Sequence, residues 1–436
     1  MTGASRRGRA AAACAALAVL LAAAGCATNG SASQGGNSHA VLTLDVFQPF
    51  SGATAFEGPE QLAGCLAGVK VVNESGGVLG HKLQCVPTDD KGDPADAVPI
   101  VDKMLASTSN LVGVVGPAQT APAVVPLITA SKVPMFSDCG CAQYDHSTNP
   151  YYFRIDPSDS LAGIAMAYWA YTSYGKHAAA SFTNDPGAQT TVPALLQEYK
   201  HLGGNFAANQ TLVPDQTSYR TEVQSLMGSH PSAIVTEMDP QTAATYFSEV
   251  QQLDNGTFPK VEVTNLGLKS SYIQAVSSAI GKSVFSSNFV SVAPISPTGP
   301  GFQSYKRAVV TLGSAIKQPA QYLTDSYSIA DFDSVILMAL AMTEAKSTNP
   351  STWVHLVTGI ANGGAGATLV HSYSAGVAAS KAGHKVAYIG ANGPFDFNKY
   401  RNAAGAFEVL RYQPASNSEK QVGLISLAVI QRITSR

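Results

Sequence analysis

The stretch that decides the fold begins with VLTLDVF (41–47), continues through LAGCLAGVKVV (62–72) and ends with KLQCV (82–86). The first segment is apolar and rich in β-branched residues, as a buried strand should be. The middle segment has apolar residues at helical spacing, in a helix that starts at Pro59 and stops at Gly76-Gly77. A strand, a helix and a strand in this order predict a parallel sheet covered by helices.

The same alternation continues along the chain. Asp93-Pro94 offers an N-cap and a first-turn proline for a second helix. Further strands are expected at 111–115, 133–136, 178–182, 233–236 and 261–264, with helices at 161–174, 192–202 and 242–253. This order predicts the α/β class, with parallel sheets and helices on their faces.

Composition excludes several kinds of protein. The 436 residues include 45% hydrophobic residues, which is enough for a sizeable core, and only 13% charged residues. This length predicts two or three domains, or two lobes of one pair. With 27 Lys+Arg against 29 Asp+Glu, the charge balance argues against a nucleic-acid partner. No apolar stretch of about 20 residues follows residue 25, so no later transmembrane helix is expected.

The N-terminal residues have the pattern of an export signal. Three arginines precede about fifteen apolar residues, too few to span a membrane. The segment ends in AAGC (23–26), which resembles a bacterial lipobox. We therefore expect a signal peptide at 1–25, a lipid on Cys26 that holds the protein to the extracytoplasmic face of the membrane, and a flexible tether at 26–40. The alternative is an ordinary secretory signal with a chance cysteine.

Cysteine usage agrees with export. Cys65 falls on the first helix and Cys85 on the next strand, so we expect a disulfide between them. Sequence alone cannot choose among the pairings of four cysteines. Cys139 and Cys141 could form a short-loop disulfide, two free thiols or half of a metal site. No zinc-like spacing accompanies them, and no metal is expected.

Several motifs occur in the order found in a known family. They are NESGGVLG (73–80) with Asp89-Asp90 and Asp93-Pro94, GVVG (113–116) with Gln119-Thr120, VPMFS (133–137), DSY (325–327) with FDSV (332–335), and GPFDF (393–397). This series resembles the leucine/isoleucine/valine-binding proteins, which have the type I periplasmic binding fold. The resemblance implies two α/β lobes joined by three hinge crossings, in a monomeric solute-binding lipoprotein that serves an ABC permease. We place the first lobe at 41–157 and 289–392 and the second at 158–288 and 393–436.

Candidate ligand-binding residues follow from the rule that ligands sit beyond the carboxyl ends of parallel strands. In the first lobe, Gln119 and Thr120 suit an anionic oxygen, and the resemblance implies that their loop and the loop of Ser137 and Asp138 hold the α-carboxylate of an amino acid. The alternative for Thr120 is a plain helix cap. Phe56 is a candidate apolar wall, or it packs on its own helix.

In the second lobe, Asp185, Glu237 and Asn265 follow predicted strands. Glu237 could pair with a ligand ammonium, whereas neighbouring Asp239 could simply cap the helix after Pro240. Residues 184–187 lack the Tyr-Gly step that amino-acid binders of this family commonly carry. An amino acid, an amide, a short peptide or another small carboxylate therefore stays open as the ligand.

Enzyme chemistry has little support in the sequence. None of the G-x-S-x-G, H-E-x-x-H and G-x-x-x-x-G-K-[ST] motifs occurs, and the histidines are scattered. We expect no catalytic residues and no cofactor. The remaining alternative is a lipoprotein sensor that binds the same kind of ligand but reports to a signalling receptor.

Overall fold

The computed structural model describes residues 40–52, 54–254, 256–295 and 299–434. Within these residues the strands form sheets of five, seven and two strands. The predicted signal peptide, Cys26 and nearly all of the tether lie outside the described residues. None of the helices in the described part of the chain is both long and apolar enough to cross a membrane.

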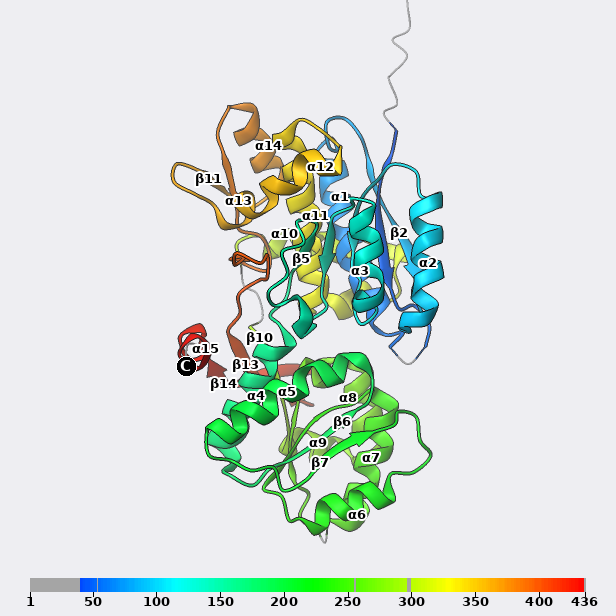
Figure 1. Cartoon of the computed structure of the whole chain (residues 1–436), viewed down its shortest axis with the longest axis vertical. Helices are drawn as coiled ribbons and strands as arrows, with labels where there is room; N and C mark the ends of the chain where they lie inside the picture. The colour runs from blue at the N-terminus through cyan, green and yellow to red at the C-terminus, as the bar shows by residue number, and fades with distance from the viewer. Residues whose placement is uncertain (1–39, 53, 255, 296–298, 435–436) are drawn as a thin grey trace, which may run out of the picture. The chain divides into compact units, whose positions relative to one another are not determined.

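The first sheet has the strand order β2-β1-β3-β4-β5, and every pairing in it is parallel. Its strands are β1 (Leu42–Gln48), β2 (Leu83–Asp89), β3 (Leu111–Val115), β4 (Met135–Ser137) and β5 (Tyr152–Arg154). Helices α1 (Glu57–Glu74) and α11 (Ser326–Ala345) cover one face, and α2 (Pro94–Ser107) and α3 (Ala121–Ala130) cover the other (Figure 1). The parallel α/β architecture predicted from the alternation is confirmed for this lobe.

Close packing of α1 on α11 forms the centre of the first lobe. Helix α11 is buried on all sides from Ser328 to Met342, so its apolar residues need no amphipathic pattern. Two glycines of α1 allow the approach, because a Cβ at Gly64 would overlap the Ser328 carbonyl oxygen and one at Gly68 would overlap Val335. At Gly64 the two backbones therefore meet directly, and at Gly68 the side chain of Val335 packs against the backbone of α1.

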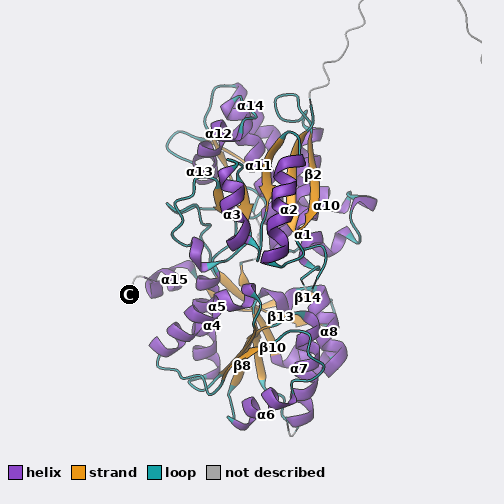
Figure 2. Ribbon diagram, turned by 45° about the vertical axis from the view of Figure 1, so that its right-hand side comes forward, coloured by secondary structure: helices purple, strands orange, loops and turns teal. Residues whose placement is uncertain are grey.

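The second sheet has the strand order β14-β13-β10-β9-β8-β6-β7. Its strands are β6 (Ala179–Thr183), β7 (Asn209–Leu212), β8 (Ala233–Glu237), β9 (Lys260–Val263), β10 (Phe289–Pro294), β13 (Phe407–Gln413) and β14 (Ser418–Ile425). The pairs from β10 to β7 are parallel, and β13 and β14 are added antiparallel. Helices cover both faces of the sheet (Figure 2): α4 (Asp159–Tyr174), α5 (Pro186–His201) and α15 (Leu427–Thr434) on one, and α6 (Arg220–Gly228), α7 (Pro240–Leu253), α8 (Ser270–Ile280) and α9 (Lys282–Asn288) on the other.

The remaining elements belong to the first lobe. They are α10 (Phe302–Val310), α12 (Pro350–Trp353), α13 (Val357–Asn362), α14 (Tyr373–Lys381) and the two-stranded sheet of β11 (Thr368–Val370) and β12 (Val386–Tyr388). Their buried side chains, including Trp353 and Tyr373, join the core around α11.

The chain passes between the two sheets after β5, after β10 and before β13. Strand β10 pairs with β9 and β13, so residues 289–294 lie in the second sheet and not in the first-lobe segment that we expected to begin at 289. Phe395 and Phe397 pack in the first core, beside Phe153, although we expected the second lobe to resume at 393. An apolar strand such as β10 suits either core, so its sequence could not fix these limits.

Two disulfides lie in the first lobe. One joins Cys65 of α1 to Cys85 of β2, with Cα atoms 6.2 Å apart. The other joins Cys139 and Cys141, which are separated only by Gly140 and have Cα atoms 5.1 Å apart. The first connects a helix to the strand that follows it, and the second closes a tight loop after β4.

Substitution Gly64→Ala tests the α1–α11 contact. Alanine should favour an isolated helix by about 1 kcal/mol, but overlap with the backbone of α11 should cost more, typically about 1–3 kcal/mol net. We expect a lower free energy of unfolding in urea. The control is Gly359→Ala in α13, where a Cβ meets open space, and it should leave stability unchanged or raise it. An equal response of the two variants would contradict the close-packing argument.

Candidate ligand-binding site

A cavity of about 390 Å³ lies between the carboxyl ends of the strands of the two sheets. The first lobe contributes residues from the loop before α1, from the turn after β3 and from the loop after β4. The second lobe contributes the residues that follow β6, β8 and β9, together with the start of α4. The lining residues used below are Phe56, Glu57, Gln119, Asp138, Cys139, Gly140, Cys141, Asp159, Thr183, Asp185, Gly187, Thr190, Glu237, Asp239, Asn265 and Tyr327.

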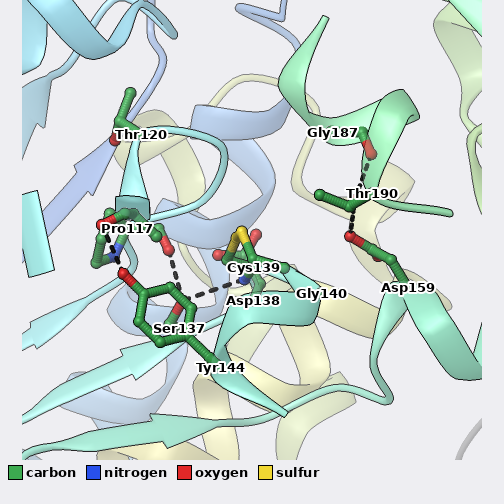
Figure 3. The surroundings of a disulfide bond; sticks show 12 residues. Pro117, Thr120, Ser137, Asp138, Cys139, Gly140, Tyr144, Asp159, Gly187 and Thr190 are labelled. Carbon is green, nitrogen blue, oxygen red and sulfur yellow. Dashed lines mark hydrogen bonds between the residues drawn. A yellow bond between two sulfur atoms is a disulfide. The ribbon is translucent and has the colours of Figure 1, made fainter. Parts of the chain in front are cut away.

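Most of the expected site residues line this cavity: Phe56, Gln119, Asp138, Asp185, Glu237 and Asn265. Thr120 and Ser137 do not. Thr120 is fully buried, and its hydroxyl donates to Asp90 Oδ2 at 2.6 Å. It makes no side-chain bond at the start of α3, so the helix-cap alternative is wrong as well. The hydroxyl of Ser137 is also buried, and it donates to the Pro117 carbonyl oxygen at 2.6 Å (Figure 3).

Two carboxyl groups of the first lobe face the cavity. Glu57 Oε2 accepts a hydrogen bond from Gln119 Nε2 at 2.8 Å. Asp138 accepts from Gln48 Nε2 at 3.1 Å through Oδ1 and from Gln61 Nε2 through Oδ2. Neutral amides of β1, α1 and the turn after β3 therefore hold both carboxyl groups without adding a positive charge.

The second lobe presents three further carboxyl groups at its strand ends. Asp185 caps α5 by accepting from Ala188 N at 2.9 Å, and it also accepts from the Thr183 hydroxyl. Asp239 caps α7 through Oδ1, as its alternative interpretation predicted, and its buried Oδ2 accepts no hydrogen bond. Glu237 ends β8, and the nearby charge of Asp185 adds to burial in raising the pKa of the Glu237 carboxyl.

Asp159 completes the acidic lining from the first turn of α4. Its Oδ2 accepts a hydrogen bond from the Thr190 hydroxyl of α5, and it lies against the loop closed by Cys139 and Cys141 (Figure 3). A Cβ at Gly140 would overlap the Asp159 carboxylate, so glycine is needed at that position. The disulfide loop thus forms part of the wall beside the first crossing between the lobes.

Burial and mutual repulsion raise the pKa values of these acids. The pKa of Glu57 rises to about 8, first because the group is buried and then because Asp138 is close. Burial raises the pKa of Asp159 to about 6, and the hydrogen bond from Thr190 offsets part of this rise. The pKa of Glu237 lies well above its usual range because of burial and the charges of Asp185 and Asp159. Among the described residues that line the cavity, none is Lys, Arg or His.

The nearest lysine is already paired. Lys269 Nζ lies 2.7 Å from Glu60 Oε2 of α1 and 2.7 Å from Asp325 Oδ2 at the start of α11. Burial would raise the pKa of Asp325, but the Lys269 charge outweighs it and the pKa falls. This trio lines a second hollow of about 490 Å³, which extends toward β13 and β14 and away from the ends of β3 and β4. The ion pair joins the lobes, since Lys269 precedes α8 and its partners belong to the first lobe.

Three of the lining residues that sequence reasoning missed carry ionisable or hydrogen-bonding groups that matter for the site: Glu57, Asp159 and Tyr327. Glu57 follows Phe56 directly, so the same loop could have indicated it. Tyr327 lies in a motif that carries the family resemblance, and its hydroxyl accepts from Asn265 Nδ2 of the other lobe at 2.8 Å. Asp159 begins a helix after a crossing, where no strand end gives a signal. Within the described residues, no group of three or more His, Cys, Asp or Glu side chains is placed to hold a metal ion.

The family model for periplasmic binding proteins matches residues 43–398. The chain belongs to this family, and its resemblance to the leucine/isoleucine/valine-binding proteins is confirmed. A solute-binding role follows for the chain. No curated protein sequence matches the chain.

Solved structures share the type I fold at low sequence identity. A leucine-binding protein from Thermotoga maritima has a TM-score of 0.69 at 15% identity, covering 88% of this chain and 99% of its own. A fatty acid ABC transporter substrate-binding protein from Thermomonospora curvata has a TM-score of 0.70 at 14% identity, covering 90% of this chain and 94% of its own. A solute-binding protein from R. palustris in complex with benzoate has a TM-score of 0.69 at 14% identity, covering 88% of this chain and 96% of its own. These structures support the fold, and their ligands differ widely.

Substitution Glu57→Gln tests the electrostatic cost of the site. The folded protein holds a proton on Glu57 up to a pKa of about 8, whereas an ordinary glutamate loses it near 4.5. The contribution of this group to stability is therefore full at pH 4 and is lost as the pH rises through 8. We expect the variant to match the parent at pH 5 and to exceed its free energy of unfolding by more than about 1 kcal/mol at pH 9.

The control for this measurement is Glu222→Gln, which changes an exposed glutamate of α6. It should leave the difference between pH 5 and pH 9 unchanged. A Glu57→Gln variant that is less stable than the parent at pH 9 would contradict the description of Glu57 as a buried and repelled carboxyl.

Proposed function

We propose that the chain is an extracytoplasmic solute-binding lipoprotein that captures a small polar ligand between its lobes and delivers it to an ABC importer. The observation that carries the proposal is the cavity at the facing carboxyl ends of the two sheets, lined by residues of both lobes. Ligands of open α/β sheets bind at this edge. The volume of about 390 Å³ falls within the usual range for small-molecule pockets.

Ligand capture works by closure of the two lobes on the segments that cross between the sheets. In the closed form, Lys269 reaches Glu60 and Asp325, and Asn265 reaches Tyr327. Opening the lobes would separate these pairs and expose the strand ends to water. A ligand that contacts both walls adds interactions present only in the closed form, so it shifts the population toward closure.

The family relationship supports an ABC permease as the partner of the closed form. It also supports a location outside the cytoplasm, where the lipobox-like segment at residues 23–26 would place an anchor. The disulfide between Cys65 and Cys85 suits such an oxidising location. The limits of the lobes and the assignment of individual ligand-binding residues are part of this proposal.

An amino acid, an amide or a small carboxylate was the ligand class expected from sequence. The relatives support a small solute, since they include proteins described with leucine and with benzoate. In this chain, however, the hydroxyls of Thr120 and Ser137 are engaged within the first lobe and do not reach the cavity. The proposed carboxylate site in this lobe therefore has little support.

A thermal-shift screen tests the solute-binding proposal. The purified mature chain is screened against amino acids, amides, amines and small carboxylates. A solute present at 100 times its Kd should stabilise the folded protein by about 2.7 kcal/mol, which is a measurable rise in melting temperature. The control is the same screen on protein unfolded in urea, which should show no saturable binding. No stabilisation by any of the classes would contradict the proposal.

Substitution Cys26→Ala tests the lipid anchor. Without the thiol that accepts the lipid, the protein should leave the membrane fraction of the producing bacterium. Fractionation followed by immunoblotting measures this change. The control is Cys65→Ala, which removes a cysteine from the folded part and should leave the membrane attachment intact. If the Cys26→Ala protein stayed in the membrane fraction, the anchor would have to lie elsewhere.

A further inference from the structure

The acidic side chains that line the cavity indicate the chemical class of its solute. We infer that the ligand is a small organic cation, with one or more ammonium or guanidinium groups and no carboxylate. This inference rests on the proposed solute-binding function and narrows its ligand class. Three features support a cation: the walls are acidic, the nearby bases are paired with other acids, and buried oxygen atoms of the walls lack a hydrogen-bond donor among the described residues.

The walls are acidic on both sides of the cavity. The lining acids are Glu57, Asp138, Asp159, Asp185, Glu237 and Asp239, and the described lining residues include no base. Glu57 and Asp138 belong to the first lobe, and the other four belong to the second. Burying carboxylates without positive partners is costly, and each raises the pKa of its neighbours. A cation placed between the walls would offset this cost.

The two nearby bases, Lys269 and Arg154, are paired with other acids, although the charge of Lys269 still offsets part of the rise that burial causes in the pKa values of Glu57 and Asp138. The charge of Lys269 is shared between Glu60 and Asp325, so this trio is itself net negative when all three are ionised. Arg154 lies behind the disulfide loop, where it pairs with Asp145 at 2.7 Å and donates to the carbonyl oxygen of Cys141 at 3.2 Å. A ligand carboxylate would therefore meet negative charge with no cation to receive it.

The walls also present more hydrogen-bond acceptors than donors to a ligand. Gln119 Oε1 and Asp239 Oδ2 are buried acceptors without a donor. The Gln119 amide nitrogen, in contrast, is already used by Glu57. An ammonium group has three donors and no acceptor, and a guanidinium has five donors. A donor-only ligand group therefore fits walls that present mainly acceptors.

The lobes come close together where these acids lie. A Cβ built on Gly187 of α5 would stand 3.5 Å from Gln119 Cγ of the first lobe and 4.0 Å from Glu237 Oε1. Besides burial, the charge of Asp185 across this gap raises the pKa of Glu57, and the charge of Glu57 raises the pKa of Glu237, so ionisation of the facing carboxyl groups opposes closure. A cation between Glu57 and Glu237 would favour their ionised forms and attract both, so binding and closure would be coupled through charge. Phe56 and Tyr327 add aromatic surface that suits a cation with an alkyl chain.

A bare metal ion fits less well than an organic cation. In the described part of the chain no group of three or more potential ligand side chains converges on one point. The acids are instead spread over both walls of a cavity of about 390 Å³, which is many times the share of one water molecule, about 30 Å³. Such spacing suits a chain of several carbons that carries its charges apart.

Isothermal titration calorimetry of the mature chain tests the inference with four probes. These are 1,4-diaminobutane, its uncharged counterpart 1,4-butanediol, leucine and hexanoate. We expect saturable binding of the diamine and none of the diol or hexanoate. Leucine should bind more weakly than the diamine, because its carboxylate meets an acidic wall.

Substitution Glu237→Gln then locates the binding. A cation beside Glu237 favours the ionised carboxylate, so replacing this side chain by a neutral amide should weaken diamine binding by about 10- to 100-fold. Removing a repelled buried charge should leave the melting temperature of the ligand-free protein equal or higher, which separates lost binding from misfolding. The matched control Glu222→Gln, on the exposed face of α6, should bind like the parent.

The outcomes separate this inference from the function on which it rests. Binding of leucine, hexanoate or another non-cationic solute from the screen, with no binding of the diamine, would overturn the cation and leave solute binding intact. Diamine binding that is unchanged in Glu237→Gln would also overturn it, because the cation would then bind elsewhere. Failure of every solute class in both experiments would overturn the solute-binding function as well.

Discussion

The constraint on which the rest of this structure depends is the parallel direction of its strands. Each parallel strand needs a helix to return the chain, so helices cover both faces of the sheets and leave the carboxyl edges for loops. The turns after β3, β4, β6, β8 and β9 therefore gather at facing edges of the two lobes. Residues distant in sequence, such as Glu57 and Glu237, become opposite walls of one cavity because of this topology.

Placing these carboxyl groups together at one cavity costs electrostatic free energy, and the packing of the first lobe offsets this cost. Carboxyl groups at the cavity raise one another's pKa values, so ionising them without a cation in the cavity is costly. The close contact of α1 with α11 fixes Glu57 and Glu60 on a rigid helix, and the Cys65–Cys85 disulfide joins that helix to β2. Core packing thus supports a group of charges that would otherwise favour an open or unfolded chain. Loss of stability at a binding site is a common counterpart of function.

Sequence reasoning could predict the parallel sheets, and six of its eight candidate residues line the cavity, because periodicity locates strand ends and the topology brings them together. It could not predict the direction of a hydroxyl. Thr120 follows β3 as a ligand-binding residue would, but Asp90, directly after the neighbouring strand β2, accepts the hydrogen bond of its hydroxyl. Nor could it locate Asp159, which reaches the cavity because Gly140 leaves room for it. The limits at 289 and 393 failed because apolar residues there suit either core.

The pairing between the lobes explains how an acidic cavity can still close. Lys269 of the second lobe forms ion pairs with Glu60 and Asp325 of the first lobe. Its Nζ also lies 4.6 Å from the centre of the Tyr327 ring. Tyr327 in turn accepts from Asn265 and lines the cavity. The same ring therefore contacts both the ion pair and the ligand space. If the proposed ligand binds in this cavity, Tyr327 is the side chain through which we expect its occupancy to affect the ion pair that joins the lobes.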